Sequence, residues 1–286
     1  MIMERPRGRD RPPPPEPLPS PVVDTHCHLD IAYDDRAEEF PPSEAIATAD
    51  AVGVTHLVQI GCDLASARWT IDALQRHSQL VGGVSLHPNE APRLAAAGRL
   101  QDALSEIQSL AESHERVRVI GETGLDYYRT GGDGRPAQEE SYRAHIDLAN
   151  RLHKTLQIHD RDAHDDVVRV LEDAGPPERV IFHCFSGDEA MARHCAARGW
   201  YLSFAGPVTF KNADPLRAAL AVTPLSLLLV ETDAPFLTPH PYRGRPNASY
   251  LIPVTVRTIA EVLGRDLTEV CEALRGNAFR ALGGPW

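Results

Sequence analysis

Eight short apolar runs, separated by longer segments of helical periodicity, are the feature that most constrains the fold of this 286-residue chain. The runs are mostly too brief for core helices, and strands that alternate with helical segments are typical of βαβ units. We expect strands at residues 22–26, 55–60, 80–86, 117–121, 155–159, 179–183, 200–204 and 227–231. The pattern therefore predicts an α/β fold with a parallel sheet.

The segments between the runs carry apolar residues at spacings of three and four. In residues 138–152, for example, Tyr142, Ile146 and Ala149 fall on one helical face. We expect helices there and at residues 43–52, 65–77, 101–114, 163–174, 188–198, 213–221 and 254–282. The size and order of the elements fit a (β/α)8 TIM barrel with C-terminal helices, and a doubly wound open sheet is the alternative.

Residues 1–21 are rich in Pro and Arg and contain almost no apolar residues that could join a core. We predict a disordered, partly polyproline tail, followed by one TIM-barrel domain over residues 22–286. A ligand for a proline-recognition domain is a second interpretation of the tail.

Composition narrows the class of protein. The five cysteines form no CxxC pair, which argues against a disulfide framework and a thiolate zinc module. No stretch approaches the roughly 20 apolar residues of a membrane span, and the N-terminus lacks the apolar core of a signal peptide. We therefore expect a soluble cytoplasmic protein with no membrane contact and no obligate protein partner.

The formal net charge of −11 argues against a protein that coats nucleic acid through a broad basic face. It does not exclude a nuclease, because metal sites need carboxylates and bound cations invert the local field.

Metal-binding residue types fall at the ends of several predicted strands. His26 and His28 are two residues apart at the end of the first strand, so both side chains point the same way. An HxH pattern alone is a weak signal. It is joined by His159 and His183, which end the fifth and sixth strands, and by Glu122 and Asp233, which follow the fourth and eighth strands. Barrel enzymes place their chemistry at this end of the strands, and polar groups there are costly unless ligated or hydrogen-bonded.

Four histidines and two carboxylates at one mouth can hold two divalent ions with a bridging carboxylate, as in two-metal hydrolytic sites. Nitrogen and oxygen ligands suit Zn, Mg, Mn, Co or Fe, so the identity of the metal stays open. Cys27 and Cys184 flank ligands, and we expect both to point away from the site as packing residues.

From residue 22 onward the chain resembles the TatD family of metal-dependent deoxyribonucleases, which are relatives of the amidohydrolase barrels. The motifs that carry the resemblance are DTHCHLD at 24–30, LHP at 86–88, GETGLDYY at 121–128, QIHDRDA at 157–163, FHCFSG at 182–187, LVETDAPFL at 229–237 and GNAFRAL at 276–282.

The resemblance implies a barrel fold, a cytoplasmic setting and activity on DNA ends or single strands. It implies that His26, His28 and Asp233 hold the first metal, that Glu122 bridges, and that His159 and His183 hold the second. Two places depart from the usual family pattern. Val84-Ser85-Leu86 precedes His87 where GxHP is common, and Ser249 stands at the proline position of RxNxP.

For hydrolysis we expect a metal-activated water as nucleophile, with Asp233 as general base and then general acid. Asp233 and Glu122 are the predicted catalytic residues; an alternative is that Asp233 is only a ligand. The residues predicted to contact substrate are His87, Arg161, Lys211, Arg243 and Arg245. Tyr127, Tyr128 or Phe185 are candidates for stacking on a terminal base.

Three functions compete. The first is a DNA exonuclease that trims single-stranded or frayed ends. The second keeps the metals and hydrolyses another ester or amide, such as an aminoacyl-tRNA or a lactone. The third is a non-catalytic metal-binding or adaptor protein, which the complete ligand set disfavours.

Overall fold

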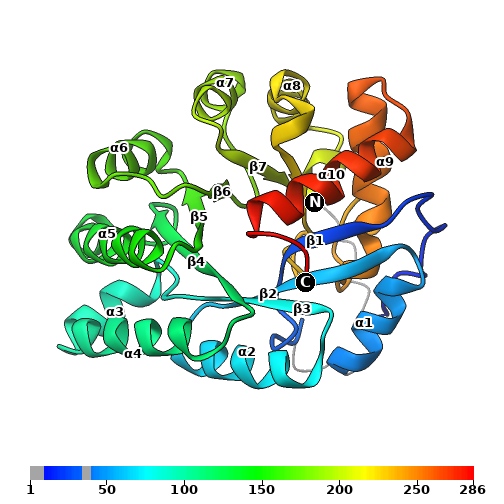
Figure 1. Ribbon diagram of the computed structural model, residues 1–286. Helices are drawn as coiled ribbons and strands as arrows, with labels where there is room; N and C mark the ends of the chain where they lie inside the picture. Colours follow the sequence, from blue (N-terminus) through cyan, green and yellow to red (C-terminus); the bar gives the residue numbers. More distant parts are fainter. Residues whose placement is uncertain (1–9, 34–39) are drawn as a thin grey trace, which may run out of the picture.

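The structure, a computed structural model, describes residues 10–33 and 40–286. Eight parallel strands form one sheet in sequential order, and the helices surround them as an outer ring (Figure 1). The strands are β1 (Val22–Cys27), β2 (Val54–Gly61), β3 (Leu80–Val84), β4 (Val117–Asp126), β5 (Thr155–Arg161), β6 (Val180–Phe182), β7 (Tyr201–Phe204) and β8 (Leu228–Val230). The predicted (β/α)8 barrel is confirmed, and the open sheet is excluded.

The barrel closes where β8 meets β1. An isolated parallel bridge joins Cys27 to Ala234, and the Thr25 hydroxyl donates to the Val230 carbonyl at 3.0 Å. Asp24 reinforces the closure, because its carboxylate accepts bonds from both the backbone N–H and the hydroxyl of Thr232. Burial raises the pKa of Asp24 to about 7, against the lowering effect of these bonds.

The strands begin close to the predicted positions, but two end elsewhere. β4 continues to Asp126 rather than ending at Gly121, and it pairs with β5 as far as Arg161. β3 ends at Val84, and the N–H of Leu86 is satisfied by the His145 side chain at 3.1 Å. These differences carry the polar ends of β3, β4 and β5 into the mouth of the barrel.

Ten α-helices lie among the described residues. They are α1 (Pro42–Asp50), α2 (Leu64–Arg76), α3 (Glu90–Ala96), α4 (Leu100–Ser113), α5 (Arg135–Leu152), α6 (His164–Ala174), α7 (Glu189–Ala197), α8 (Asp214–Val222), α9 (Ile252–Leu263) and α10 (Leu267–Ala281). Helix α3 was not predicted. In the part of the chain described, no helix combines the length and the apolar character needed to cross a membrane.

The helical segment predicted over 254–282 consists of two helices, because the chain breaks between α9 and α10. Gly264 ends α9 in the left-handed conformation with φ of 61°. Asp266 then caps α10 by accepting from the backbone N–H groups of Thr268 and Glu269.

Helix α10 and the chain end cover the N-terminal end of the barrel (Figure 1). Inward-facing residues of the strands, such as Val23, Val119 and Leu229, pack in one cluster with Ala281 and Leu282. The interior is therefore a filled core that is covered at the N-terminal end of the barrel. The polar strand ends gather at the opposite, open end.

The described part of the predicted tail, residues 10–21, lies against the barrel instead of being disordered. Leu18 is buried in the core, and its N–H donates to the Val52 carbonyl at 3.1 Å. The Tyr250 hydroxyl donates to the Pro12 carbonyl at 2.6 Å, and Arg257 donates to the Pro17 carbonyl at 3.0 Å. The proline-rich segment thus supplies backbone acceptors to distant donors. The first nine residues lie outside the described part.

We expect the Tyr250→Phe substitution to lower the free energy of unfolding by about 1 kcal/mol, because it removes a buried hydrogen bond and leaves the Pro12 carbonyl without its donor. Chemical denaturation of both proteins measures the change. Tyr128→Phe is the matched control, since Tyr128 is 64 % exposed. Equal losses in the two variants would contradict a specific contact to the segment.

Candidate metal centre

His26 and His28 present their Nε2 atoms to the mouth of the barrel, 3.2 Å apart. In each ring the other nitrogen, Nδ1, contacts a polar group of the protein. Nδ1 of His26 lies 2.9 Å from Gln157 Oε1, and Nδ1 of His28 donates to the Ile60 carbonyl at 2.9 Å. Because a carbonyl only accepts, Nδ1 of His28 carries a proton, and Nε2 is the ring nitrogen directed toward Asp233 and Glu122. This is the arrangement expected of histidines that bind a metal.

The closure between β8 and β1 brings Asp233 to these histidines. The N–H of Asp233 donates to the His26 carbonyl at 3.0 Å, and the N–H of His28 donates to the Ala234 carbonyl at 2.8 Å. The carboxylate Oδ1 of Asp233 lies 3.7 Å from His26 Nε2 and 3.3 Å from His28 Nε2. The backbone of Asp233 is left-handed with φ of 53°, a conformation that non-glycine residues adopt mainly at constrained sites.

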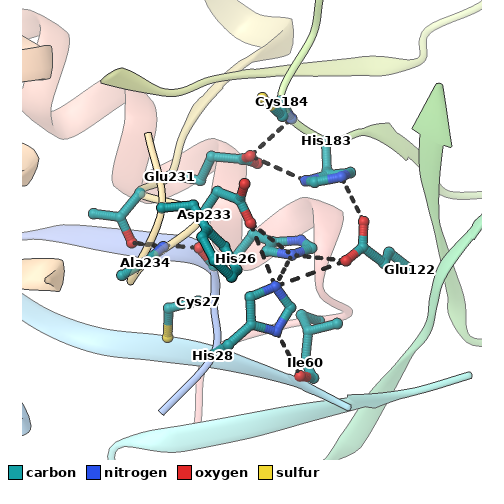
Figure 2. Close-up of polar contacts among 12 residues, drawn as sticks. His26, Cys27, His28, Ile60, Glu122, His183, Cys184, Glu231, Asp233 and Ala234 are labelled. Carbon is teal, nitrogen blue, oxygen red and sulfur yellow. Dashed lines mark hydrogen bonds and ion pairs between the residues drawn. The ribbon is translucent and has the colours of Figure 1, made fainter. Parts of the chain in front are cut away.

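Glu122 lies between two sets of histidines, as Figure 2 shows for His26, His28 and His183. Its Oε1 is 3.6 Å from His26 Nε2 and 3.7 Å from His28 Nε2. Its Oε2 is 2.7 Å from His183 Nε2 and 3.0 Å from His159 Nδ1. One carboxylate therefore faces both predicted sites, with one oxygen toward each.

The placement of Glu122 and His159 depends on a close approach of β4 and β5. Gly124 lies over the carbonyl of His159, where a Cβ atom would be 2.0 Å from the oxygen, and its φ is +143°. Only glycine fits there. The two strands thus run side by side up to the mouth with both functional side chains facing the cavity.

Glu231 supports His183 and was not identified from the sequence. Its buried carboxylate Oε1 accepts from the backbone N–H of Cys184 at 2.7 Å and lies 3.1 Å from His183 Nδ1. A carboxylate behind a ligating histidine orients the ring and raises its basicity. The available signal was its position two residues before Asp233.

The charges of the centre compensate one another. Burial alone would raise the pKa of Glu122, but the charge of His183 and the hydrogen bonds from His159 and His183 hold it well below its usual range. Burial likewise opposes ionisation of Asp233, but the neighbouring His28, His26 and His183 together outweigh it and lower the pKa of this carboxyl group. Both carboxylates are therefore ionised and available to a cation.

The donor set fits divalent ions. Ligand atoms about 2.0–2.2 Å from a tetrahedral ion lie roughly 3.3–3.6 Å from one another. The three atoms contributed by His26, His28 and Asp233 are separated by 3.2, 3.7 and 3.3 Å. On the other side, His183 Nε2 and His159 Nδ1 are 3.4 Å apart and share Glu122 Oε2. The structure thus brings together all six predicted ligands. The number of ions that they bind and the identity of the metal stay predictions.

A cavity of about 600 Å³ opens over the centre. Of the predicted substrate contacts, His87 and Arg161 line it. Burial lowers the pKa of His87 to about 3, so its ring is neutral. Nδ1 of His87 accepts from the Asn89 N–H at 3.1 Å, which places the ring proton on Nε2, 3.9 Å from Glu122 Oε2.

Lys211, Arg243 and Arg245 are not among the residues that line this cavity. The guanidinium of Arg243 lies 4.4 Å from the centroid of the Phe210 ring. Arg245 donates to the backbone carbonyls of Asp10 and Arg11, so it holds the N-terminal segment. The structure therefore does not support these three residues as substrate contacts at the centre.

Other residues of the cavity were missed or misplaced by the sequence interpretation. Arg129 and Asp126 line the cavity because β4 extends past Gly121. Cys62 lies 3.2 Å from Glu122 Oε1, and Cys184, expected to point away, also lines the cavity. Cys27 points away as predicted, with its thiol directed to the Val58 carbonyl.

Comparison with known proteins matches this chain to one family. The family model described as "TatD related DNase" matches residues 23–283. An uncharacterized metal-dependent hydrolase TatD of Mycobacterium tuberculosis is 44 % identical and covers 93 % of this chain and 99 % of its own length. The uncharacterized metal-dependent hydrolase YabD of Bacillus subtilis is 36 % identical, over 91 % of this chain and 98 % of its own.

Solved structures share the fold. The crystal structure of YjjV, a TatD homolog from Escherichia coli K12, superposes with a TM-score of 0.80 at 24 % identity, over 92 % of this chain and 98 % of that chain. The E. coli phosphotriesterase homology protein, complexed with phosphate in its active site, gives a TM-score of 0.68 at 17 % identity, over 91 % and 97 %.

We expect the Glu231→Gln substitution to weaken divalent-metal affinity by about 10- to 100-fold, because it removes the charge behind His183. Titration calorimetry of the metal-stripped protein with Zn or Co measures the affinity. Glu269→Gln, at a half-exposed helix carboxylate, is the control. Unchanged affinity in the Glu231 variant would show that this carboxylate does not support a metal ligand.

His145 makes the stability pH-dependent. Burial lowers its pKa to about 4 from 6.5, although donation to the Ser141 carbonyl raises it. Between these values the unfolded chain binds a proton that the folded protein does not. The contribution of neutral His145 to the free energy of unfolding is therefore complete above pH 6.5 and is lost as the pH falls toward 4.

We expect the unfolding free energy of the metal-free protein to fall more steeply with acidification than that of the His145→Gln variant, by up to about 1.4 kcal/mol per pH unit. Urea unfolding at several pH values between 4.5 and 7 measures both slopes. Parallel slopes would mean that His145 titrates normally in the folded protein.

Proposed function

We propose that this chain, which belongs to the TatD family of metal-dependent hydrolases, is a deoxyribonuclease that trims single-stranded or frayed DNA ends. The observation that carries the proposal is the position of Glu122 between two sets of histidines, beneath a cavity lined by Arg129 and Arg161. Two adjacent cation sites with cationic side chains above them suit a phosphodiester, which carries a negative charge.

The relatives support this proposal at different levels. The family model is described as a DNase, whereas the relatives in Mycobacterium tuberculosis and Bacillus subtilis are named only as metal-dependent hydrolases. Metal-dependent hydrolysis is thus common to all of them, and DNA as the substrate is the finer step that we propose.

Divalent ions bound by the six residues would neutralise the phosphate oxygens and lower the pKa of a nucleophilic water. The chain itself supplies proton transfer. Asp233 is ionised, lies at the edge of the cluster and lines the cavity. Its carboxylate accepts the proton of the water whose oxygen bonds to phosphorus, and the P–O bond to the leaving sugar breaks. The same proton then passes to the leaving oxygen.

His87 and the two arginines position the phosphate. Because Nε2 of neutral His87 carries its proton, it donates a hydrogen bond into the cavity without adding charge. The guanidinium of Arg161 lies 3.9 Å from the centroid of the Tyr128 ring, which restricts its plane. Planar guanidinium groups pair with phosphate oxygens through two parallel bonds.

We expect metal-stripped protein to shorten end-labelled single-stranded DNA stepwise once Mg, Mn, Co or Zn is restored. Asp233→Asn is expected to lower kcat by about 10²- to 10⁴-fold, because the proton acceptor is lost. Asp214→Asn, at an exposed carboxylate that does not line the cavity, is the matched control. Glu122→Ala is expected to abolish both activity and metal binding.

If the wild type binds metal but shortens no DNA with any of these ions, the nuclease proposal fails. Hydrolysis of aminoacyl-tRNA or lactones by the same preparation would then favour another ester or amide as the substrate.

A further inference from the structure

Exposed apolar side chains are gathered at the mouth of the cavity. Among the described residues, the exposed large hydrophobic side chains are Ile31, Tyr128 and Phe236, at 36 %, 64 % and 42 % exposure. Ile31 and Phe236 line the cavity, and Tyr128 stacks on Arg161, which also lines it. Single exposed apolar residues are normal on any surface, but their concentration at one site indicates a binding surface.

The cavity has two chemically different walls. The loops after β7, β8 and β1, which are adjacent in the barrel, contribute Pro207, Phe236, Leu237 and Ile31. The ends of β3 to β6, on the other side, contribute polar residues: Asn89, Asp126, Arg129, Asp160, Arg161 and Ser186. The metal centre lies between an apolar wall and a polar wall.

The polar wall carries two arginine side chains, Arg129 and Arg161. Asp126 is engaged by the Asn89 side chain and the Arg129 N–H, and Asp160 pairs with His164 at 2.6 Å. In the part of the chain that the structure describes, neither Arg129 nor Arg161 pairs with a carboxylate. Two guanidinium groups that line a cavity without an ion-pair partner are complementary to phosphate.

The apolar wall is rigid. The N–H of Phe236 donates to the Asp233 carbonyl at 2.9 Å, and its own carbonyl accepts from the Asn247 side chain at 2.6 Å. The carbonyl of Leu237 lies so close to Gly206 that a Cβ there would be 2.0 Å from the oxygen. The ring of Phe236 is 6.4 Å from the ring of His28 by centroids. The aromatic ring of Phe236 is thus fixed next to His28, a predicted metal ligand.

We infer that Phe236, with Ile31 on the same wall, is a nucleobase subsite that stacks on the base of the terminal nucleotide, while Arg129 and Arg161 hold phosphate on the opposite wall. The inference rests on the proposed nuclease function. A strand cannot pass through the barrel, because its interior is filled with side chains. A cavity of about 600 Å³ is of the size that encloses one small ligand, so it accommodates a chain end.

The test compares single-stranded oligonucleotides that differ only in the terminal nucleotide, which carries either a base or a tetrahydrofuran abasic sugar. Both 3′ and 5′ versions are used. We expect the wild type, with the metal that supports cleavage, to prefer the base-bearing end in kcat/KM by about 5- to 150-fold, the range that stacking of one base supplies.

Phe236→Ala is expected to reduce this preference to near unity by raising KM on the base-bearing end while leaving the abasic end unchanged. Phe236→Leu keeps an apolar side chain without an aromatic face, so an intermediate preference is expected. Trp286→Ala removes an aromatic side chain near the opposite end of the barrel, where its ring contacts Phe279, and should keep the wild-type preference.

Equal cleavage of base-bearing and abasic ends by the wild type would overturn the subsite while leaving the nuclease function intact. So would a Phe236→Ala loss that is the same on both substrates. Absence of cleavage of either oligonucleotide with every metal would instead overturn the nuclease function, and the subsite with it.

Discussion

A carboxylate buried among histidines is the constraint on which the rest of the site depends. Glu122 is 4 % exposed, and an ionised carboxylate at such depth is stable only if positive or hydrogen-bonding groups surround it. Each histidine that faces it must therefore be held in a fixed orientation. Gln157, the Ile60 carbonyl and Glu231 hold His26, His28 and His183 from behind. The geometry of the candidate metal centre therefore depends on these supporting contacts as well as on the predicted ligands themselves.

The contacts that stabilise the barrel and the residues of the candidate site lie at opposite ends of the barrel. At its N-terminal end, α10 and the chain terminus pack on the inward-facing strand residues, and Arg118 donates to the carbonyls of Leu282 and Gly284. At the other end the strands stop with polar side chains that face a cavity. Because the C-terminal ends of the strands meet outside the packed interior, functional groups from distant parts of the chain come together there without disturbing the core.

The N-terminal segment and the loop after β8 are linked in the same region. Arg245 binds the carbonyls of Asp10 and Arg11, while its own carbonyl accepts from the Thr238 hydroxyl. Asn247 donates to the carbonyls of Thr232 and Phe236. The loop that carries Asp233 and the apolar wall is therefore fixed by backbone bonds, which favours a preorganised site.

The sequence by itself determined the eight strands, most of the helices and the six candidate metal ligands that meet at the mouth of the barrel. These follow from local rules: periodicity identifies the strands, and parallel strands in a closed barrel bring their C-terminal ends to one mouth.

The substrate-facing residues did not follow, because loop direction depends on contacts with remote segments. Arg245 faces residues 10 and 11 rather than the cavity, and Arg129 enters it because β4 pairs further with β5. Residues 10–21 look disordered from their composition, yet Tyr250 and Arg257 supply donors to their carbonyls. Only the tertiary structure decided these points, because backbone groups that satisfy distant side chains leave no pattern in the local sequence.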